Sequence, residues 1–440
     1  MGTWAEGDPE PRAGNALEVL IDGAAALPAM AKTIAAARSH VHVTGWHITP
    51  EFQLTRGDRP TTLQQLLAEV ATRIPVRVLI WAGAPLPVLR PWRGDIRQAR
   101  DRLCAGNRIQ CALDARERPL HCHHEKTIVV DDRIAFVGGI DLTNFSGDRW
   151  DEPHHPPRGA IGWHDVAARL TGPAVRDVAE NFAMRWRATT GETLPSVAAA
   201  APAGAVEVQV VRTVPDHMYA QLPRGDFRIL ESYLLALRAA QRFIYLENQF
   251  LWSPEILEVL RDKLLHPPSP DFRLVLILPA RPNSAGDDTR GQLGTLVQAD
   301  DGAGRLLACT LYAVGGDRDW PVYVHAKVGI VDDAWMTIGS ANLNEHSLFN
   351  DTEMNLVTRD RGLIRDTRLR LWAGHLERHL DAISGDPTGV IDTIWKPTAE
   401  EQAQRRASGE RQTHRLTTLP GVSRRSRLLL GPLQGLVVDA

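Results

Sequence analysis

The sequence predicts an α/β protein built from two similar sandwich domains. Three observations indicate this class: one eight-residue pattern occurs twice, strand and helix patterns alternate in the same order in each half, and a stretch without amphipathic period separates the halves. The two copies of the pattern begin at His124 and His325, so nearly half of the 440-residue chain lies between them. A repeat of this length indicates two domains that share one fold.

Strands and helices are predicted in the same order in both halves. The first half has a helical pattern at Leu27–Arg38 and strand patterns at Val41–Thr44, Val76–Trp81 and Arg108–Leu113. The second half has a helical pattern at Ile229–Arg242 and strand patterns at Phe243–Leu246, Phe272–Leu278 and Leu306–Leu311. Apolar residues at helical spacing predict helices, and short runs rich in β-branched residues predict strands. Each half is therefore expected to be an α/β sandwich.

A stretch from Gly191 to Gly204 separates the halves. It contains an Ala-Ala-Ala-Ala-Pro-Ala run and no amphipathic period, which is typical of a linker. We predict a first domain at residues 1–192, a linker at 193–205 and a second domain at 206–395. Residues 396–440 are predicted to be a basic tail with a final apolar segment. This tail is either a solvated linker with a final strand or a contact with anionic lipid.

The composition is that of an ordinary globular protein. Apolar residues make up 43% of the chain and charged residues 23%, and the net charge of −3 gives no electrostatic argument for a nucleic-acid partner. The N-terminus does not resemble a secretory signal, and no run approaches the length of a transmembrane helix. We expect a cytoplasmic monomer that reaches a membrane surface from solution, as a peripheral protein.

Cysteine and histidine usage gives no reason to expect a metal. The four cysteines have no spacing typical of a disulfide framework, so a reduced chain is the simpler interpretation. The run His121-Cys122-His123-His124 contains zinc-binding residue types. Because adjacent residues of a strand point to opposite faces, this run is not expected to converge on one ion. We predict neither a metal nor an organic cofactor.

The repeated pattern is H-x-K-x-x-x-x-D, with His124 and Lys126 in the first copy and His325 and Lys327 in the second. Residues two apart on a strand share a face, so each half offers an imidazole beside an ammonium group. Lysine neutralises the charge of a phosphodiester, while one histidine can attack phosphorus and the other can protonate the leaving oxygen. Only five lysines occur in the chain, and two of them are in this pattern. The pattern therefore predicts one phosphodiester-processing site, shared by both halves across a pseudo-two-fold axis.

The aspartates that end the two copies, Asp131 and Asp332, are candidate catalytic residues by their place in the motif. They lie an odd number of residues from their histidines, so on an unbroken strand they point away from the imidazoles. Each is followed by a second aspartate, Asp132 or Asp333, which is typical of a turn between hairpin strands. We favour the turn, and we expect the carboxylates that orient the histidines to come from elsewhere in the chain.

These motifs resemble those of the phospholipase D superfamily, which is defined by two such copies. The likeness is greatest to phosphatidylcholine-type phospholipases D, and it includes further stretches of both halves. These stretches are Gly138–Leu142, Arg149–Asp151, Trp163–Val166, Gly172–Val175, Arg185–Trp186 and Ile244–Phe250. The resemblance implies a duplicated phospholipase D fold with the active site at the interface between the domains.

The resemblance also implies the carboxylates that orient the histidines. Members of the superfamily place an acidic residue in the stretch after each motif, so we assign Asp151 to His124 and Glu353 to His325. For Glu247, the sequence leaves open whether its carboxylate lies at the edge of the site or supports another residue.

The small-residue stretches after the motifs are expected to contact the substrate phosphate. The candidate residues are Asn342, Ser340, Gly139 and Asp141. The amide of Asn342 can donate a hydrogen bond to a phosphate oxygen, whereas an ionised Asp141 can only accept one. Because these two residues occupy equivalent places in the repeat, the site is predicted to be asymmetric.

The resulting hypothesis is a phospholipase D that hydrolyses the head-group phosphodiester bond of glycerophospholipids to phosphatidate. Its phosphohistidine forms on His124, an assignment made by resemblance alone, and an alcohol can replace water as acceptor. The alternatives are a cardiolipin-synthase-like phosphatidyltransferase, a metal-independent nuclease and a degenerate lipid-binding scaffold. They are disfavoured, respectively, by the lack of hydrophobic N-terminal segments, by the acidic charge balance and by the completeness of both motifs.

Overall fold

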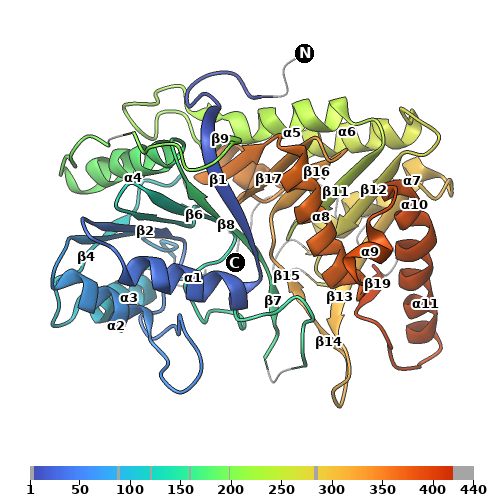
Figure 1. Cartoon of the computed structure of the whole chain (residues 1–440), viewed down its shortest axis with the longest axis horizontal. Coiled ribbons are helices and arrows are strands. Elements are labelled where there is room, and N and C mark those ends of the chain that lie inside the picture. The colour runs from blue at the N-terminus through green and yellow to red at the C-terminus, as the bar shows by residue number, and fades with distance from the viewer. Residues whose placement is uncertain are drawn as a thin grey trace.

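A computed structural model describes residues 4–86, 90–118, 121–157, 160–197, 199–281 and 286–419. The first half contains β1 (Arg12–Ile21), α1 (Gly23–Ala35), β2 (Val41–Gly45), α2 (Leu63–Ala71), β3 (Val76–Trp81), α3 (Arg93–Cys104), β4 (Gln110–Asp114), β5 (Thr127–Val130), β6 (Ile134–Gly138), β7 (Trp163–His164), β8 (Val166–Thr171) and α4 (Val175–Thr190). Figure 1 shows these elements in blue and green, beside a second half in yellow and red.

The second half begins with β9 (Val206–Val214), β10 (Asp226–Phe227), α5 (Arg228–Ala239), β11 (Phe243–Glu247), α6 (Pro254–Leu265), β12 (Arg273–Ile277), α7 (Gly286–Asp300) and β13 (Leu306–Ala313). Its motif region contains β14 (Trp320–Pro321), β15 (Tyr323–Val324), β16 (Val328–Val331), β17 (Trp335–Gly339), the short π-helix η1 (His346–Asn350) and β18 (Glu353–Thr358). It ends with α8 (Arg361–Leu376), α9 (Leu380–Ile383), α10 (Pro387–Val390), η2 (Ile391–Trp395), α11 (Lys396–Ala407) and β19 (Leu416–Thr418).

Both halves form a mixed sheet with the same strand order. The first sheet runs β4-β3-β2-β5-β6-β8-β1, in which β2, β3 and β4 are parallel and the remaining pairs are antiparallel. The second runs β13-β12-β11-β16-β17-β18-β9, again with three parallel strands and antiparallel pairs after them. Because β1 pairs with both β8 and β9, it joins the two sheets. The predicted pair of similar α/β sandwich domains is confirmed.

The central strands are apolar runs because both of their faces are covered. Helices α1, α2 and α3 pack over one face of the first sheet, and α5, α6 and α7 pack over one face of the second. A further apolar cluster contains residues of both halves, among them Val137, Ala168, Val210, Ile338 and Leu356. This shared core fixes the two sheets against each other, and the motif hairpins β5–β6 and β16–β17 lie within it.

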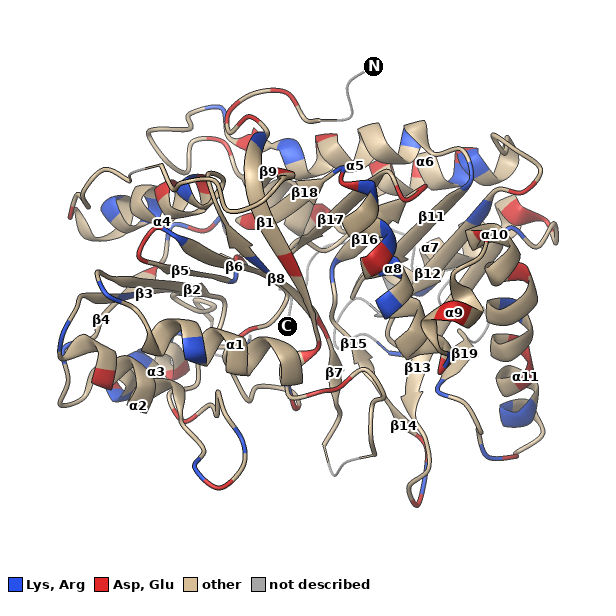
Figure 2. Cartoon of the chain, viewed as in Figure 1, with Lys and Arg blue, Asp and Glu red and all other residues tan. Residues whose placement is uncertain are grey.

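Capping residues at the N-termini determine where some of the helices begin. Thr62 caps α2 through a reciprocal pair of hydrogen bonds with Gln65, and Ser253 caps α6, whose first residue is Pro254. Such caps supply acceptors for backbone N–H groups that the first turn of a helix cannot satisfy. Figure 2 shows Lys or Arg and Asp or Glu interspersed along the surface helices, such as α4, α8 and α11.

The predicted tail differs from what the structure shows. Residues 396–407 form α11, and β19 pairs antiparallel with β13 at the edge of the second sheet. Residues 396–419 therefore extend the second half instead of forming a solvated tail. The sequence prediction missed this helix because its apolar side is small: Ala399 and Gln402 are its buried residues. The final apolar segment lies outside the described residues, and the predicted domain boundaries stay predictions.

Candidate active site

The motif hairpins turn on pairs of aspartates in the left-handed conformation. Asp131 and Asp132 have φ values of 57° and 53°, and Asp332 and Asp333 have 53° and 46°. In each turn the N–H of Arg133 or Ala334 donates to the carbonyl of Val130 or Val331, and the two central aspartates have the positive φ of a type I′ turn. Aspartate tolerates positive φ better than most residues. The turn favoured from the parity of the sequence is therefore present in both halves.

The carboxylates of Asp131 and Asp332 point away from the histidines and hold the loop before the neighbouring strand. Asp131 accepts backbone N–H bonds from Arg38, Ser39 and His40. Asp332 accepts the equivalent bonds from Gln241, Arg242 and Phe243. Their inclusion among the catalytic candidates is wrong: the motif aspartates fix the loops that lead into β2 and β11.

Asp131→Ala is expected to destabilise the protein by about 1–3 kcal/mol, because it removes an acceptor and strains a positive φ. Burial opposes the ionisation of Asp131, but the hydrogen bonds from Ser39, Arg38 and His40 outweigh it and lower its pKa. This stability is therefore present above the unfolded pKa, about 3.9, and is lost as the pH falls through the folded value. Urea unfolding measures the loss. Asp131→Asn, which keeps an acceptor and tolerates the turn, is the control, and equal losses for both variants would contradict this role.

The two motif histidines converge on one pocket at the interface between the halves. His124 and His325 both line it, together with Trp46, Asp141, Phe145, Arg149, Trp163 and Gln249. His124 is 4% exposed and His325 5% exposed, so both imidazoles are almost fully buried. The lysine ammonium groups lie beside them: Lys126 donates to the carbonyl of His124 at 2.8 Å, and Lys327 donates to the carbonyl of His325.

Each histidine is oriented by a carboxylate of the opposite half. Nδ1 of His124 lies 2.8 Å from Oε1 of Glu353, and Nδ1 of His325 lies 2.6 Å from Oδ2 of Asp165. Backbone hydrogen bonds also cross the interface here. The N–H of His124 donates to the carbonyl of Thr352, and the N–H of His325 donates to the carbonyl of His164. The Nε2 atom of each ring, which is not engaged by the carboxylate, is the atom available for chemistry.

The predicted partners of both histidines are therefore wrong. Asp151 accepts from Nδ1 of His155 at 3.0 Å, and Glu353 orients His124 instead of His325. Sequence reasoning missed Asp165, although Trp163–Val166 was among the stretches that resemble the superfamily. A signal was present: each orienting acid lies at the start of the strand that follows the motif hairpin, β8 or β18. The long segment between β6 and β8 hides this equivalence in the sequence.

The small residues after the motifs make room for these carboxylates. A Cβ atom on Gly139 would lie 2.1 Å from Oδ1 of Asp165, so glycine is needed for the close approach. At the equivalent place in the second half, the hydroxyl of Ser340 donates to Oε2 of Glu353. Gly139 and Ser340 therefore serve the orienting acids, and their contact with the phosphate stays a prediction.

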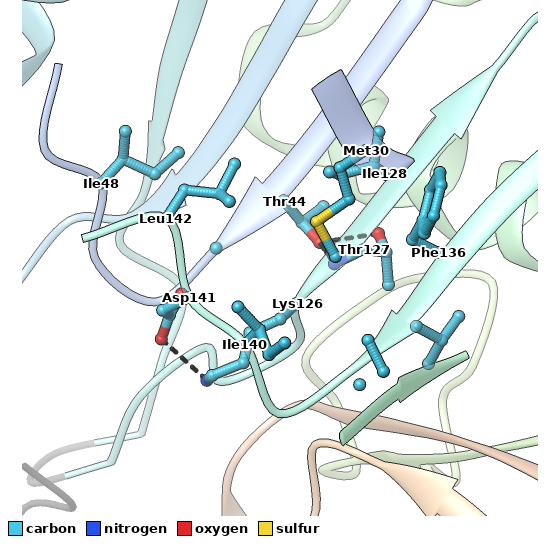
Figure 3. A pocket seen from close by; sticks show the side chains of 14 residues that line it. Met30, Thr44, Ile48, Lys126, Thr127, Ile128, Phe136, Ile140, Asp141 and Leu142 are labelled. Atoms are coloured by element: carbon cyan, nitrogen blue, oxygen red, sulfur yellow. Dashed lines mark hydrogen bonds and ion pairs between the residues drawn. The ribbon is translucent and has the colours of Figure 1, made fainter. Parts of the chain in front are cut away.

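The two lysines have different neighbours, as the asymmetry of the motifs predicts. Nζ of Lys126 lies 3.1 Å from Oδ2 of Asp141, the ion pair drawn in Figure 3. Nζ of Lys327 donates to Oε1 of Gln249 at 3.2 Å, and the same oxygen accepts from Asn342 at 3.4 Å. Asp141 thus forms an ion pair with one lysine, while an amide oxygen accepts a hydrogen bond from the other. A phosphate contact by Asn342 stays a prediction.

Arg149 adds a third cation that sequence reasoning did not assign to the site. Its guanidinium lies over the ring of Trp163 at 3.3 Å and donates to the carbonyl of Phe145 at 2.8 Å. Burial lowers its pKa to about 10, which leaves it charged at neutral pH. Arg149 and Asp141 line the pocket, and Lys126 and Lys327 lie close enough to act on His325, so the cations around the site suit an anionic group.

Burial and charge set the protonation of the oriented pairs. Burial lowers the pKa of His325 well below its ordinary value, and Lys327 and Arg149 lower it further. Burial raises the pKa of Asp165 to about 6, against the opposing effect of Lys327. It raises the pKa of Glu353 well above its ordinary value, against the effect of Lys126. Burial therefore disfavours ionisation of both orienting acids, against the attraction of the nearby lysines.

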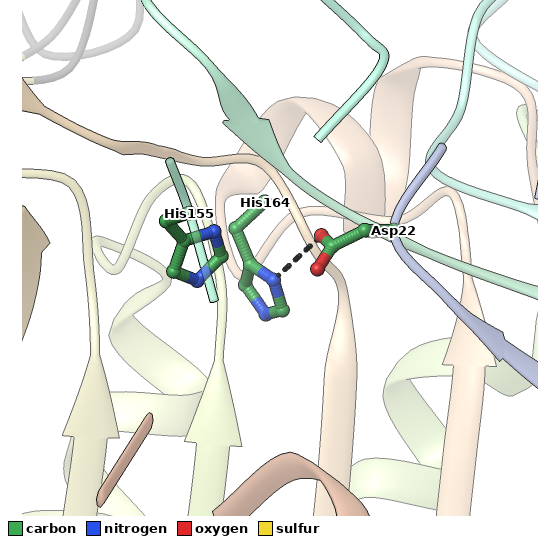
Figure 4. Close-up of side chains that lie close together, drawn as sticks. All are labelled: Asp22, His155 and His164. Carbon is green, nitrogen blue, oxygen red and sulfur yellow. Dashed lines mark hydrogen bonds and ion pairs between the residues drawn. The ribbon is translucent and has the colours of Figure 1, made fainter. Parts of the chain in front are cut away.

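His164, the residue before the orienting acid Asp165, forms hydrogen bonds with two buried carboxylates. Its Nδ1 lies 2.9 Å from Oδ1 of Asp22, as Figure 4 shows, and its Nε2 lies 2.7 Å from Oε2 of Glu247. Burial opposes a charge on this ring, but Asp22 and Glu247 outweigh it and raise the pKa of His164 well above its ordinary value. Glu247 thus has the supporting role that the sequence left open, since it also holds His375 at 3.0 Å.

The fold and the site define a class: a duplicated α/β protein in which each half contributes a histidine–lysine pair to one pocket. The phospholipase D family model matches residues 33–162 and 157–263, and the model described as the phospholipase-D-like domain of cardiolipin synthase matches residues 236–372. Together these matches cover more than half of the sequence. The chain belongs to the phospholipase D superfamily.

Curated relatives agree with this membership. Phospholipase D A of Dictyostelium discoideum is 25% identical over 79% of this chain, and phospholipase D2 of Bos taurus is 24% identical over 82%. The chain spans 34% and 50% of the lengths of these relatives. Phosphatidylserine synthase of Haemophilus influenzae Rd KW20 shares the fold, with a TM-score of 0.52 over 89% of this chain and 94% of its own, at 14% identity.

Proposed function

We propose that the protein is a phospholipase D type phosphodiesterase that cleaves the head-group phosphodiester bond of glycerophospholipids to phosphatidate. The observation that carries the proposal is the pocket in which His124 and His325 face one another, each held at Nδ1 by a carboxylate of the opposite half. Named relatives of the superfamily support the substrate class. None of the described helices is long and apolar enough to cross a membrane.

In the proposed first step, Nε2 of His124 attacks phosphorus and the bond to the head-group oxygen breaks. Lys126, Lys327 and Arg149 hold the charge of the non-bridging oxygens in a buried site, where such interactions are strong. His325 gives its proton to the departing oxygen. The bound anion favours this proton, because it offsets the cations that lower the pKa of His325 in the free site. Asp165, whose carboxylate lies 2.6 Å from Nδ1 of His325, stabilises the resulting imidazolium.

In the second step, the phosphohistidine is resolved by water or by another alcohol. His325 takes the proton of the acceptor as it attacks phosphorus, and His124 leaves as a neutral ring. Water yields phosphatidate and an alcohol yields a new phosphatidyl ester. The cardiolipin-synthase-like match over residues 236–372 favours transfer to an alcohol as a second candidate function.

The proposal is tested with mixed phospholipid vesicles, with and without a primary alcohol, followed by identification of the lipid products. Phosphatidate without the alcohol and phosphatidyl-alcohol with it are the expected results. The alcohol product would also indicate a covalent phosphatidyl-enzyme. Degradation of plasmid DNA without turnover of any lipid would instead support the nuclease alternative.

The pH profile gives an independent test of the His325–Asp165 pair. We expect kcat/KM to fall as the pH drops below about 6, because protonated Asp165 no longer supports an imidazolium. Burial raises this pKa, so protonation of Asp165 favours the folded state and the fall is not caused by unfolding at this group. Circular dichroism at each pH checks this point. A kcat/KM that stays constant down to pH 5 would contradict the assignment.

A further inference from the structure

A group of two histidines and an aspartate lies near the catalytic residues, at the interface between the halves. His121 precedes the first motif, His346 begins η1 and Asp351 follows it. Nδ1 of His121 lies 2.8 Å from Nδ1 of His346 and 3.6 Å from Oδ1 of Asp351. One nitrogen or oxygen of each residue lies within 4.8 Å of those of the other two.

We propose that His121, His346 and Asp351 bind one divalent transition-metal ion of the zinc type. Imidazole and carboxylate are donors that such ions take, and three protein donors leave a fourth position for water. The proposal does not rest on the proposed function, because these groups are not used in the phosphodiester chemistry.

The donor distances fit an ion of this size. Tetrahedral bonds of 2.0–2.2 Å place neighbouring donors about 3.3 Å apart, and the distances of 2.8 Å and 3.6 Å lie on either side of this value. The two facing Nδ1 atoms share at most one proton between them, and an ion can take the place of that proton. The third pair of donors, on His346 and Asp351, lies within 4.8 Å.

The electrostatics favour a cation. Asp351 is 1% exposed, and its Oδ1 accepts the N–H of Cys122 at 2.7 Å. Its other oxygen, Oδ2, is buried and has no hydrogen-bond partner in the described part of the chain. The ionic partner found for this carboxylate among the described residues is an imidazole, His121, and not a lysine or arginine. The negative charge of this buried carboxylate is compensated by imidazoles and one backbone N–H, and a divalent ion between the same groups would stabilise it further.

The position gives an ion access from solvent and would let it link the two halves. The side chain of His121 is 18% exposed, which leaves an entry path for the ion and room for a water ligand. His121 comes from the first half and the other two donors from the second, so the ion would cross-link the halves. It would do so next to the His123–Thr352 bridge, which lies one residue from both His124 and Glu353. Binding to the folded chain alone raises its stability.

The buried histidine groups around His164, one of which Figure 4 draws, are less suited to an ion. Both ring nitrogens of His164 already face carboxylates at 2.9 Å and 2.7 Å, and the raised pKa keeps this ring cationic. The imidazolium lies between Asp22 and Glu247, where it would repel an added cation. The catalytic histidines can also bind added metal. The test must therefore distinguish metal binding there from metal binding at the proposed site.

The experiment uses the full chain after treatment with a chelator, titrated with Co²⁺ and with Zn²⁺. We expect one Co²⁺ per chain with the strong visible absorption of a four-coordinate site, displaced by Zn²⁺, and a higher Tm with Zn²⁺. His121→Gln should weaken binding by more than about 100-fold, because even the loss of a residue that only supports a ligand costs about 10–100-fold. Its Tm without metal should match that of the parent, since His121 is partly exposed.

Three comparisons make the outcome decisive. Asp351→Asn should also abolish binding, and His121→Gln decides the matter alone if that buried variant fails to fold. His266→Gln is the matched control, because His266 lies 3.0 Å from Asp262 on an exposed helix end, and it should bind like the parent. Absence of 1:1 binding in the parent would overturn the proposal. Binding kept in His121→Gln and lost in His124→Gln would also overturn it, because the ion would then lie in the catalytic pocket.

Discussion

His325→Ala is expected to lower kcat for head-group cleavage by about 10²–10⁴-fold, the usual contribution of a positioned acid. For an aryl phosphodiester the first step should be nearly intact, because a phenolate of low pKa leaves without a proton, and the later resolution of the phosphohistidine still needs His325 as base. His325→Ala should therefore release about one phenolate per chain in a burst, whereas His124→Ala should show no burst, since it removes the nucleophile. Pre-steady-state phenolate release measures this difference, with His217→Ala as a control on an 85%-exposed side chain.

This pair of variants also decides which histidine attacks. The two rings have nearly equivalent positions, and the assignment of His124 as nucleophile comes from the resemblance to the superfamily. If His124→Ala gave the burst and His325→Ala did not, the two roles would have to be exchanged. Equal bursts from both variants would contradict the division into nucleophile and acid altogether.

Asp165→Asn and Glu353→Gln are each expected to lower kcat by about 10²–10⁴-fold with little change in KM. An amide in either place can present its N–H to Nδ1, which would hold the imidazole in the wrong tautomer and remove the charge that supports an imidazolium. Asp151→Asn should keep kcat within a few-fold, because Asp151 contacts His155 and not a catalytic ring. Steady-state kinetics on variants of matched Tm provides the measurement.

A result that would contradict this assignment is easy to recognise. If Asp151→Asn lost as much activity as Asp165→Asn at equal stability, the hydrogen bonds across the interface would not be the ones used in catalysis. Glu353→Gln also removes the acceptor of the Ser340 hydroxyl, so Ser340→Ala serves as a further comparison. We expect it to cost less than Glu353→Gln, because the carboxylate itself remains.

The sequence by itself determined the duplication, the order of strands and helices, and the four residues that define the motif pairs. These features are local: strand alternation sets which side chains share a face, and a pair of aspartates can occupy a type I′ turn wherever it occurs. The prediction that the motif aspartates belong to the turn was correct for the same reason. The helix at Lys396–Ala407 was missed because its apolar face is too small to give a periodic signal.

Only the tertiary structure decided which carboxylate serves which histidine. Glu353 and Asp165 each cross the interface to the other half, and no spacing along one chain can show that exchange. The same is true of Arg149 and of the group formed by His121, His346 and Asp351, whose members meet only when the two sheets pack together. The physical reason is that parity and periodicity describe directions within a strand, whereas partners across an interface are set by how the shared apolar core brings two strands into register.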